Sequence, residues 1–343
     1  MLKIKVIGSG SAGNHIAYAF RNLCNSITMT DKDLKSLKIS KKEIYINRYK
    51  KWNKNISLKL EKLDDDNYDI IIISSPPNTH LKLLKKNIKN SNLFMIEKPL
   101  CEPNLKSINE FKKIIKKYKN KTFLCGYNHR LFPSTKKLIE IIKRNKLKKN
   151  IHTIEVNFKE NTSGFLKAHK WFDSLADSYL SKTVLGGGSL LEHSHALNLG
   201  QFLLDDNLKQ LKMLRSNINF LKSKNEHYDY DAKLDFVSGS KLIKIQQNFT
   251  TLPVEKNIKV SGKNFNIELI YNYKNNDDKI IYIDKKLKKI KNFYFNKTRP
   301  DDFLYEAIFL KEVFLNKNKK NILSIQNALG TMELILAGLK KTN

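Results

Sequence analysis

The sequence lacks the features that would place it among membrane, secreted or disulfide-bonded proteins. It has no run of about 18 apolar residues, so no transmembrane helix is expected. Its first residues lead directly into the strand-like LKIKVI, without the apolar region of a signal peptide. The three cysteines, Cys24, Cys101 and Cys125, show no CxxC spacing, which argues against a disulfide framework or a zinc site. These absences predict a cytoplasmic protein with no bound metal and no membrane partner.

Acidic residues are scarce relative to basic ones, and the formal net charge is +31. A strongly basic surface is common in proteins that bind nucleic acids. Here, however, the lysines are spread over the whole chain among many asparagines and isoleucines. We therefore interpret the charge as a compositional bias and expect no nucleic-acid partner. Nucleic-acid binding remains the least favoured function, and a steep salt dependence of DNA affinity would indicate it.

The length of 343 residues is sufficient for two domains with separate cores. In the first part of the chain, strand-like runs alternate with helical ones, which is typical of βαβ units. The stretch YDIIIISS, Tyr68 to Ser75, is nearly continuously β-branched, as expected of a strand buried on both faces of a parallel sheet. Helices are predicted over 12–23, 33–52, 78–84 and 105–118, the third capped by Asn78.

After about residue 150, strands follow one another closely and turn residues separate them. Two helices, over 301–315 and 324–339, are expected to close the chain. The predicted fold is therefore α/β. A Rossmann domain with a doubly wound parallel sheet should occupy 1–127, and an α+β domain with an open, mostly antiparallel sheet should occupy 128–343.

The segment GSGSAG, Gly8 to Gly13, matches the dinucleotide-binding pattern G-x-G-x-x-G directly after a strand and before a helix. The first glycine permits a tight turn, the second lets the backbone approach a pyrophosphate, and the third lets the helix and strand pack closely. Asp31 ends the second strand, near the position of the carboxylate that binds the ribose 2′-hydroxyl of NAD. A carboxylate there favours NAD over NADP. Lys32 weakens the preference, and Asp31 is alternatively an ordinary turn residue.

Two further segments follow predicted strands, at the edge where open α/β sheets bind ligands. They are SSPPNTH, from Ser74 to His80, and EKP, from Glu97 to Pro99. Lys98 is well placed there to meet a substrate, although a solvated lysine is the ordinary alternative in so lysine-rich a chain.

In this order and at about this spacing, the segments GSGSAG, SPPNTH, EKPL, NHRLFPSTKKL and GGGSLLEHSH resemble the glucose-fructose oxidoreductase, inositol dehydrogenase and MocA family (Gfo/Idh/MocA). The likeness extends from residue 4 to about 200, and the remaining strands and final helices fit the family's second domain. EIYINRYKKW, Glu43 to Trp52, also resembles a subgroup from bacterial surface-sugar pathways, with less specificity. The resemblance implies an NAD-dependent oxidoreductase, with NADP possible, that transfers a hydride to or from a sugar, a sugar derivative or a nucleotide sugar.

The resemblance also implies roles for particular residues. Lys98 would contact the nicotinamide ribose and the substrate, and Asn128 and Arg130 would shape the edge of the cofactor site. The substrate-binding residues would be Lys98, Trp171, Glu192 and His195; His169, Lys170 and Tyr179 could also line the sugar pocket, although core packing explains Trp171 and Tyr179 equally well. The expected cofactor-binding residues are Gly8, Ser9, Gly10, Ser11, Ala12, Gly13, Asp31, Ser75, Pro76, Asn78, His80, Glu97, Lys98, Asn128 and Arg130.

The segment after the three glycines departs from the commoner family pattern. Glu192 takes the acid position, a histidine follows three residues later at His195, and Asn198 replaces a final aspartate. Three-residue spacing on one helix would keep Glu192 and His195 neighbours. We predict Lys98, His195 and Glu192 as the catalytic residues, with His195 as base because its ordinary pKa is near working pH. His193 is the alternative base.

Two expectations concern the protein as a whole. The family's habit of pairing through the open sheet face implies a homodimer or homotetramer with a small sugar-type substrate. The alternative function is a non-catalytic dinucleotide-binding sensor, because the family also includes a repressor; the unusual GGG segment motivates it and the retained Lys98, Glu192 and His195 argue against it.

Overall fold

A computed structural model describes residues 2–168, 172–204, 211–316 and 321–342. Its contacts divide the chain into two units. The first unit contains residues 1–128 and 299–329, and the second contains 129–298 and 330–343. The first boundary lies one residue from the predicted one, but 299–329 returns to the first unit, so the division is not the continuous one drawn from the sequence.

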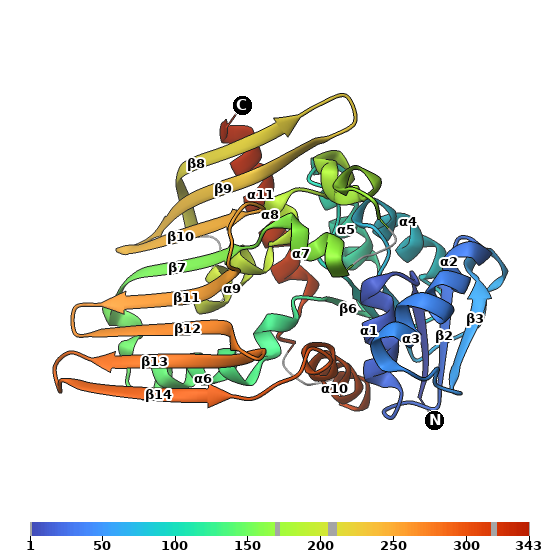
Figure 1. Cartoon of the computed structure of the whole chain (residues 1–343), viewed down its shortest axis with the longest axis horizontal. Coiled ribbons are helices and arrows are strands. Elements are labelled where there is room, and N and C mark those ends of the chain that lie inside the picture. Colours follow the sequence, from blue (N-terminus) through green and yellow to red (C-terminus); the bar gives the residue numbers. More distant parts are fainter. Residues whose placement is uncertain (1, 169–171, 205–210, 317–320, 343) are drawn as a thin grey trace. The chain divides into compact units, whose positions relative to one another are not determined.

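The first unit is built on a six-stranded parallel sheet in the order β3-β2-β1-β4-β5-β6 (Figure 1). Its strands are β1 (Lys3–Ile7), β2 (Ser26–Asp31), β3 (Ile56–Leu60), β4 (Ile70–Ile73), β5 (Leu93–Ile96) and β6 (Thr122–Cys125). This order is that of the doubly wound Rossmann fold. The predicted parallel sheet is thus confirmed, and all four isoleucines of β4 are fully buried.

Helices connect these strands and cover the sheet. They are α1 (Ser11–Phe20), α2 (Leu34–Ile39), the π-helix η1 (Ser40–Tyr45), α3 (Ile46–Tyr49), α4 (Pro77–Asn87) and α5 (Leu105–Lys117), and α10 (Asp301–Leu315) packs on α1 in the same unit. The helix predicted over 33–52 is interrupted by the π-helix. Asn78 does not cap α4: the helix begins one residue earlier, at Pro77, and its N-cap residue is Pro76. Proline suits the first helical turn, because a backbone N–H at that position would have no acceptor within the helix.

The second unit contains an eight-stranded sheet in the order β14-β13-β12-β11-β7-β10-β9-β8. The strands are β7 (Ile151–Lys159), β8 (Leu211–Lys222), β9 (His227–Ser238), β10 (Lys241–Asn248), β11 (Glu255–Gly262), β12 (Phe265–Lys274), β13 (Asp277–Asp284) and β14 (Lys289–Phe295). Only β7 and β10 pair in parallel among these strands; the other neighbours are antiparallel. The mostly antiparallel sheet is therefore confirmed.

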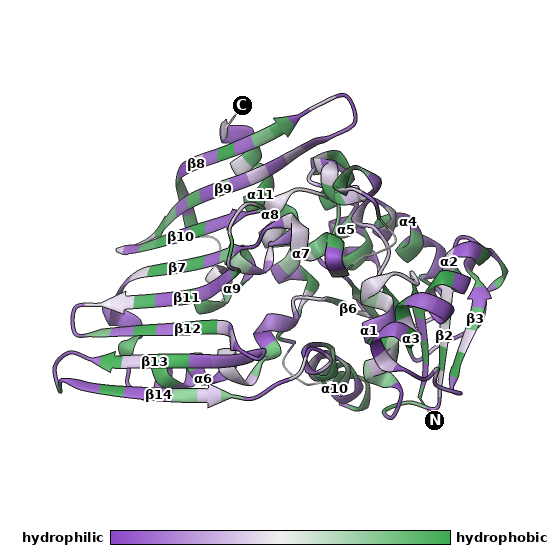
Figure 2. Cartoon of the chain, in the orientation of Figure 1, coloured by the Kyte–Doolittle hydropathy of each residue, from purple (hydrophilic) through white to green (hydrophobic). Residues whose placement is uncertain are grey.

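Alternation along these strands separates a covered face from an open one, and Figure 2 shows it as changing hydropathy along each strand. In β13, buried residues alternate with partly exposed ones. Helix α9 (His195–Leu203) packs on β7 and β10, and α6 (Pro133–Arg144) packs on β12, β13 and β14. The remaining α-helices with residues in this unit are α7 (Thr162–Ala168), α8 (Ser189–Glu192) and α11 (Ile325–Thr342). No helix within the described part of the chain is long and apolar enough to cross a membrane.

Candidate functional site

The glycine turn after β1 has two closely packed ends and an open middle. Gly8 has φ +105°, and a β-carbon on it would lie 2.8 Å from the backbone of Ser74. A β-carbon on Gly13 would lie 2.0 Å from the carbonyl oxygen of Gly8. A β-carbon on Gly10, in contrast, would meet no described atom within 4 Å. The first and third glycines are therefore required by the fold itself, whereas the second leaves space in which a ligand can approach the backbone.

Side-chain hydrogen bonds hold this turn against α1. The Asn14 amide donates to the carbonyl oxygens of Ser9 and Gly10, each at 2.8 Å. The first turn of α1 contains no acidic residue. The helix therefore directs the positive end of its dipole and its first backbone N–H groups toward the open turn, an arrangement that favours an anion such as a pyrophosphate.

Asp31 is bonded to the turn in this structure. Its Oδ2 atom accepts hydrogen bonds from the backbone N–H of Ser9 at 2.8 Å and from the Ser9 hydroxyl at 2.7 Å. Its Oδ1 atom accepts from the backbone N–H of Lys32 at 2.7 Å. The carboxylate is partly exposed and fixed at the edge of the glycine turn. Whether it binds a ribose hydroxyl stays a prediction.

The segment after β4 has an exposed part and a buried part. Pro76 and Asn78 are exposed and Ser75 is partly exposed. His80 is fully buried, with Nε2 2.7 Å from the carbonyl oxygen of Ser75 and Nδ1 3.1 Å from that of Leu100. Burial lowers the pKa of His80, against the effect of these carbonyl contacts. The imidazole therefore fixes the loop that presents its exposed neighbours.

Glu97 and Lys98 have opposite environments at the end of β5. Glu97 is buried and its Oε2 atom accepts the backbone N–H of Lys98 at 3.2 Å, whereas the Lys98 side chain is partly exposed. Glu306 of α10 is 1% exposed, and neither carboxyl oxygen has a hydrogen-bond partner among the described residues. Burial, reinforced by the charge of Glu97, raises the pKa of Glu306 well above its ordinary value. Burial and the nearby charge of Glu97 therefore both favour the neutral form of Glu306.

The GGG segment of the second unit does not form one continuous helix. Helix α8 ends at Glu192, and α9 begins at His195. At the junction, the Ser194 N–H bonds to the Leu191 carbonyl, a separation of three residues, so the chain tightens there. The expectation that Glu192 and His195 share one helix face is therefore wrong as stated, because the two residues belong to different helices.

The same junction gives the two histidines different surroundings. His193 is 7% exposed and its ring meets Phe249 edge-on at 5.5 Å. His195 and Glu192 are both partly exposed. The His195 ring lies 4.2 Å from the ring of His129, a neighbour that sequence reasoning missed. Of the two candidate bases, His195 is thus the more accessible in this unit.

The start of α8 is held by a buried aspartate from β9. Asp229 Oδ2 accepts hydrogen bonds from the Ser189 hydroxyl and the Leu190 N–H, each at 2.7 Å. The Gln247 amide approaches the Leu190 carbonyl at 3.5 Å. The backbone N–H and carbonyl of Leu190, two residues before Glu192, are therefore both held by side chains of the sheet. Asp229 lies 40 positions from Ser189 in the chain, and no local sequence pattern identifies it.

Asn128 and Arg130 lie largely inside their own units. Asn128 is buried and its amide reaches the Asp302 carbonyl at 3.5 Å. Arg130 is 1% exposed; its guanidinium donates to the Asn198 carbonyl at 2.9 Å and lies over the Phe202 ring. Asn198 thus serves as a buried partner for Arg130. The predicted cofactor contacts of both residues stay predictions.

The remaining predicted residues are only partly accounted for. Tyr179 packs against a buried cluster of Leu175, Leu180, Tyr228 and Phe249. This contact agrees with the alternative that Tyr179 serves core packing. His169, Lys170 and Trp171 lie outside the described residues.

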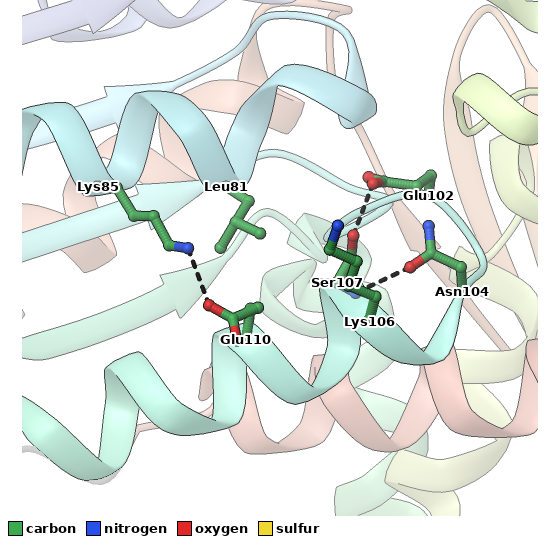
Figure 3. A pocket seen from close by; sticks show the side chains of 7 residues that line it. All are labelled: Leu81, Lys85, Glu102, Asn104, Lys106, Ser107 and Glu110. Atoms are coloured by element: carbon green, nitrogen blue, oxygen red, sulfur yellow. Dashed lines mark hydrogen bonds and ion pairs between the residues drawn. The ribbon is translucent and has the colours of Figure 1, made fainter.

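One open pocket of ≈ 460 Å³ lies along α4 and α5 (Figure 3). Part of its polar lining is internally paired, with Lys85 bonded to Glu110 and Ser107 bonded to Glu102. None of its lining residues is a predicted site residue. The chain as described contains no group of three or more His, Cys, Asp or Glu side chains that could hold a metal ion.

Comparison with known proteins agrees with the geometry of the first unit. Residues 2–127 match the family model GFO_IDH_MocA, described as "Oxidoreductase family, NAD-binding Rossmann fold". The resemblance in the sequence is thereby confirmed. Residues 2–127 are therefore similar to the NAD-binding Rossmann domain of this oxidoreductase family. No curated protein matches the sequence.

Solved structures of low sequence identity share the fold of the chain. One is a putative NADPH-dependent oxidoreductase from Desulfitobacterium hafniense, with 16% identity, TM-score 0.77, and coverage of 99% of this chain and 95% of the other. Another is an aldose-aldose oxidoreductase from Caulobacter crescentus complexed with glycerol, with 13% identity, TM-score 0.75, and coverage of 99% and 97%. A third is KijD10, a 3-ketoreductase from Actinomadura kijaniata in complex with NADP and TDP-benzene, with 10% identity, TM-score 0.74, and coverage of 98% and 96%.

Proposed function

We propose that the chain is an NAD(P)-dependent dehydrogenase or reductase acting on the CH–OH or C=O group of a sugar, a sugar derivative or a nucleotide sugar. The observation on which the proposal depends most is the glycine turn, with packed ends and an open position at Gly10, in a family of NAD-binding oxidoreductases. When bound, the nicotinamide cofactor supplies the hydride acceptor or donor. The sugar class is supported by similarity in fold to a 3-ketoreductase and an aldose-aldose oxidoreductase.

The proposed roles of the chain's own residues follow from their chemistry and accessibility. His195 takes the hydroxyl proton in oxidation and returns it in reduction, since an accessible imidazole can do both near neutral pH. The Lys98 ammonium stabilises the substrate oxygen as negative charge develops on it. Glu192 orients the imidazole, and Asp229 fixes the segment from which Glu192 projects.

The first experiment is a thermal-shift panel of NAD, NADP and activated sugars, because a ligand that binds only the folded state raises the melting temperature. Sugars that stabilise the holoprotein are then tested for hydride transfer by following the absorbance of the reduced nicotinamide. Turnover of any sugar or nucleotide sugar supports the proposal. Cofactor binding without turnover on the whole panel would instead favour the dinucleotide-binding sensor, which the break between Glu192 and His195 keeps as the second candidate.

We also propose that the protein forms a cytoplasmic homodimer or homotetramer through the open face of its second sheet. Ile290 and Tyr294 of β14 are 65% and 60% exposed, so this sheet presents large apolar side chains that such an interface could bury. Light scattering on the purified protein tests this, and a monomer at all concentrations would contradict it.

A further inference from the structure

A short segment between β2 and β3 packs over α1 beside the glycine turn. It consists of the π-helix η1 and α3, residues 40–49. The Asn14 amide donates to Ser40 Oγ at 3.0 Å, and the Tyr49 ring stacks on Tyr18 of α1 with centroids 3.7 Å apart. π-helical turns are rare and occur often at functional sites. The segment is therefore fixed to α1 at both of its ends.

Arg48 of this segment reaches Ser11, the first residue of α1 and part of the glycine turn. Its Nη2 donates to Ser11 Oγ at 2.9 Å, and its Nη1 donates to the Ser11 carbonyl oxygen at 3.1 Å. Burial lowers the pKa of the Arg48 guanidinium, with Arg299 acting in the same direction and Tyr49 against it. An arginine nevertheless keeps its charge at neutral pH. A full positive charge thus lies at the first residue of α1.

The hydrogen bond to Ser11 Oγ has a consequence for the serine. A guanidinium can only donate, so the Ser11 oxygen accepts and its own proton must be directed elsewhere. Ser11 is thereby prepared as a hydroxyl donor beside the first N–H groups of α1. The Arg48 charge adds to the positive helix terminus, and the Asp31 carboxylate accepts its hydrogen bonds from Ser9 and from the Lys32 backbone.

We propose that Arg48 is a positioning residue for the dinucleotide: it orients the Ser11 hydroxyl and supplies positive charge for the cofactor's pyrophosphate. The inference rests on the NAD-binding first unit and on no assumption about the sugar substrate. A merely structural role, in which Arg48 joins α3 to α1, predicts a loss of stability but no specific loss of pyrophosphate affinity.

The test measures binding of NADH and of ADP-ribose, which has the pyrophosphate but no nicotinamide, by titration calorimetry on the full chain. Arg48→Ala should raise the Kd of both ligands about tenfold, the effect of losing a charge-assisted hydrogen-bonding group. The salt dependence of the Kd should weaken, since one charge attracting the ligand is gone. Arg48→Lys keeps the positive charge but lacks the planar guanidinium, so its Kd values should lie between those of wild type and Arg48→Ala.

Arg21→Ala is the matched control. Arg21 stacks on Tyr18 at 3.6 Å just beyond the other end of α1, so this variant removes the same charge and comparable packing away from the turn. Its Kd should change less than about twofold. The double mutant Arg48→Ala/Ser11→Ala should lose less binding free energy than the sum of the losses in the two single mutants, because Arg48 acts partly through Ser11.

Among the variants, three results would overturn the inference: wild-type affinity in Arg48→Ala, an equal loss in Arg21→Ala, or a loss for NADH that is absent for ADP-ribose. Melting temperatures of the ligand-free variants separate unfolding from lost affinity. A wild-type protein that binds NADH but reduces no sugar would contradict the proposed activity and leave this inference standing. A wild-type protein that binds neither ligand would overturn both.

Discussion

The Oδ1 atom of Asp229 lies 2.0 Å from the point that a β-carbon on Gly188 would occupy. Gly188 also has φ +96°, a conformation that L-residues with side chains rarely adopt. Asp229 and Gly188 together therefore shape the start of α8. The carboxylate occupies the space that the glycine leaves, and from there it bonds to Ser189 and Leu190.

Gly188→Ala should lower the free energy of unfolding by about 2 kcal/mol or more, through backbone strain and the clash with Asp229. Urea denaturation followed by circular dichroism measures this. Gly239→Ala is the control, because Gly239 has φ +60° but a β-carbon there would meet no described atom within 4 Å. Equal losses in the two variants would show that the contact with Asp229 adds nothing to the backbone strain.

Asp229 should make stability depend on pH. Burial raises its pKa from 3.8 to about 6, against the hydrogen bonds from Ser189 and Leu190. The contribution to stability from an acid whose pKa is raised on folding is fully present below pH 3.8 and is lost as the pH rises through about 6. Asp229→Asn keeps an oxygen acceptor and never ionises. It should match the wild type near pH 4 and exceed its stability above about pH 7, by up to about 3 kcal/mol.

The measurement for this variant is the free energy of unfolding in urea at about pH 4 and about pH 7.5. Asp231→Asn makes the same chemical change at a partly exposed position of the same strand and is the control. Suppose that Asp229→Asn and wild type differ in free energy of unfolding by the same amount at both pH values. That result would mean that Asp229 does not titrate in this range.

The two sheets could be predicted from the sequence because their strands have local signatures. The isoleucine run of β4 indicates burial on both faces, and GSGSAG between a strand and a helix indicates the turn that the structure contains. Long-range partners have no such signature. Ser189 meets Asp229 across 40 positions, and Asn198 meets Thr331 across 133.

The break between Glu192 and His195 also escaped prediction, for a different reason. Apolar spacing indicates that a segment is helical, but it does not distinguish a bond to the fourth preceding residue from one to the third. The Ser194 N–H makes the latter bond, to Leu191. The prediction that Asn78 caps its helix was wrong for a similar local reason, since the adjacent Pro77 can itself begin the helix.

The glycine turn allows binding and stability to be separated. Gly10→Ala should weaken NADH binding tenfold or more while leaving the ligand-free melting temperature nearly unchanged, because the added methyl group enters open space. Gly13→Ala should instead destabilise the ligand-free protein, since its β-carbon would lie 2.0 Å from the Gly8 carbonyl oxygen. Calorimetric titration and thermal melting measure the two effects. If Gly10→Ala bound NADH as wild type does, the cofactor would have to lie elsewhere.

His195 and His193 should respond differently to the same substitution, provided that a sugar substrate has been found. His195→Asn should bind NADH normally and slow single-turnover hydride transfer by about 100-fold or more, as expected for loss of a general base. Lys98→Ala should slow the same step comparably when the cofactor is saturating.

His193→Asn is the matched control, because it makes the same chemical change two positions away, where the ring is 7% exposed against Phe249. It should lower the melting temperature, through lost packing, and leave hydride transfer within about tenfold of wild type. The pH dependence of the rate provides a second criterion. If His195 is the base, an ionisation that controls the rate of oxidation in wild type and in His193→Asn should disappear in His195→Asn. If the rate and this ionisation were lost in His193→Asn instead, the base would be His193. The greater exposure of His195 would then not identify the catalytic histidine.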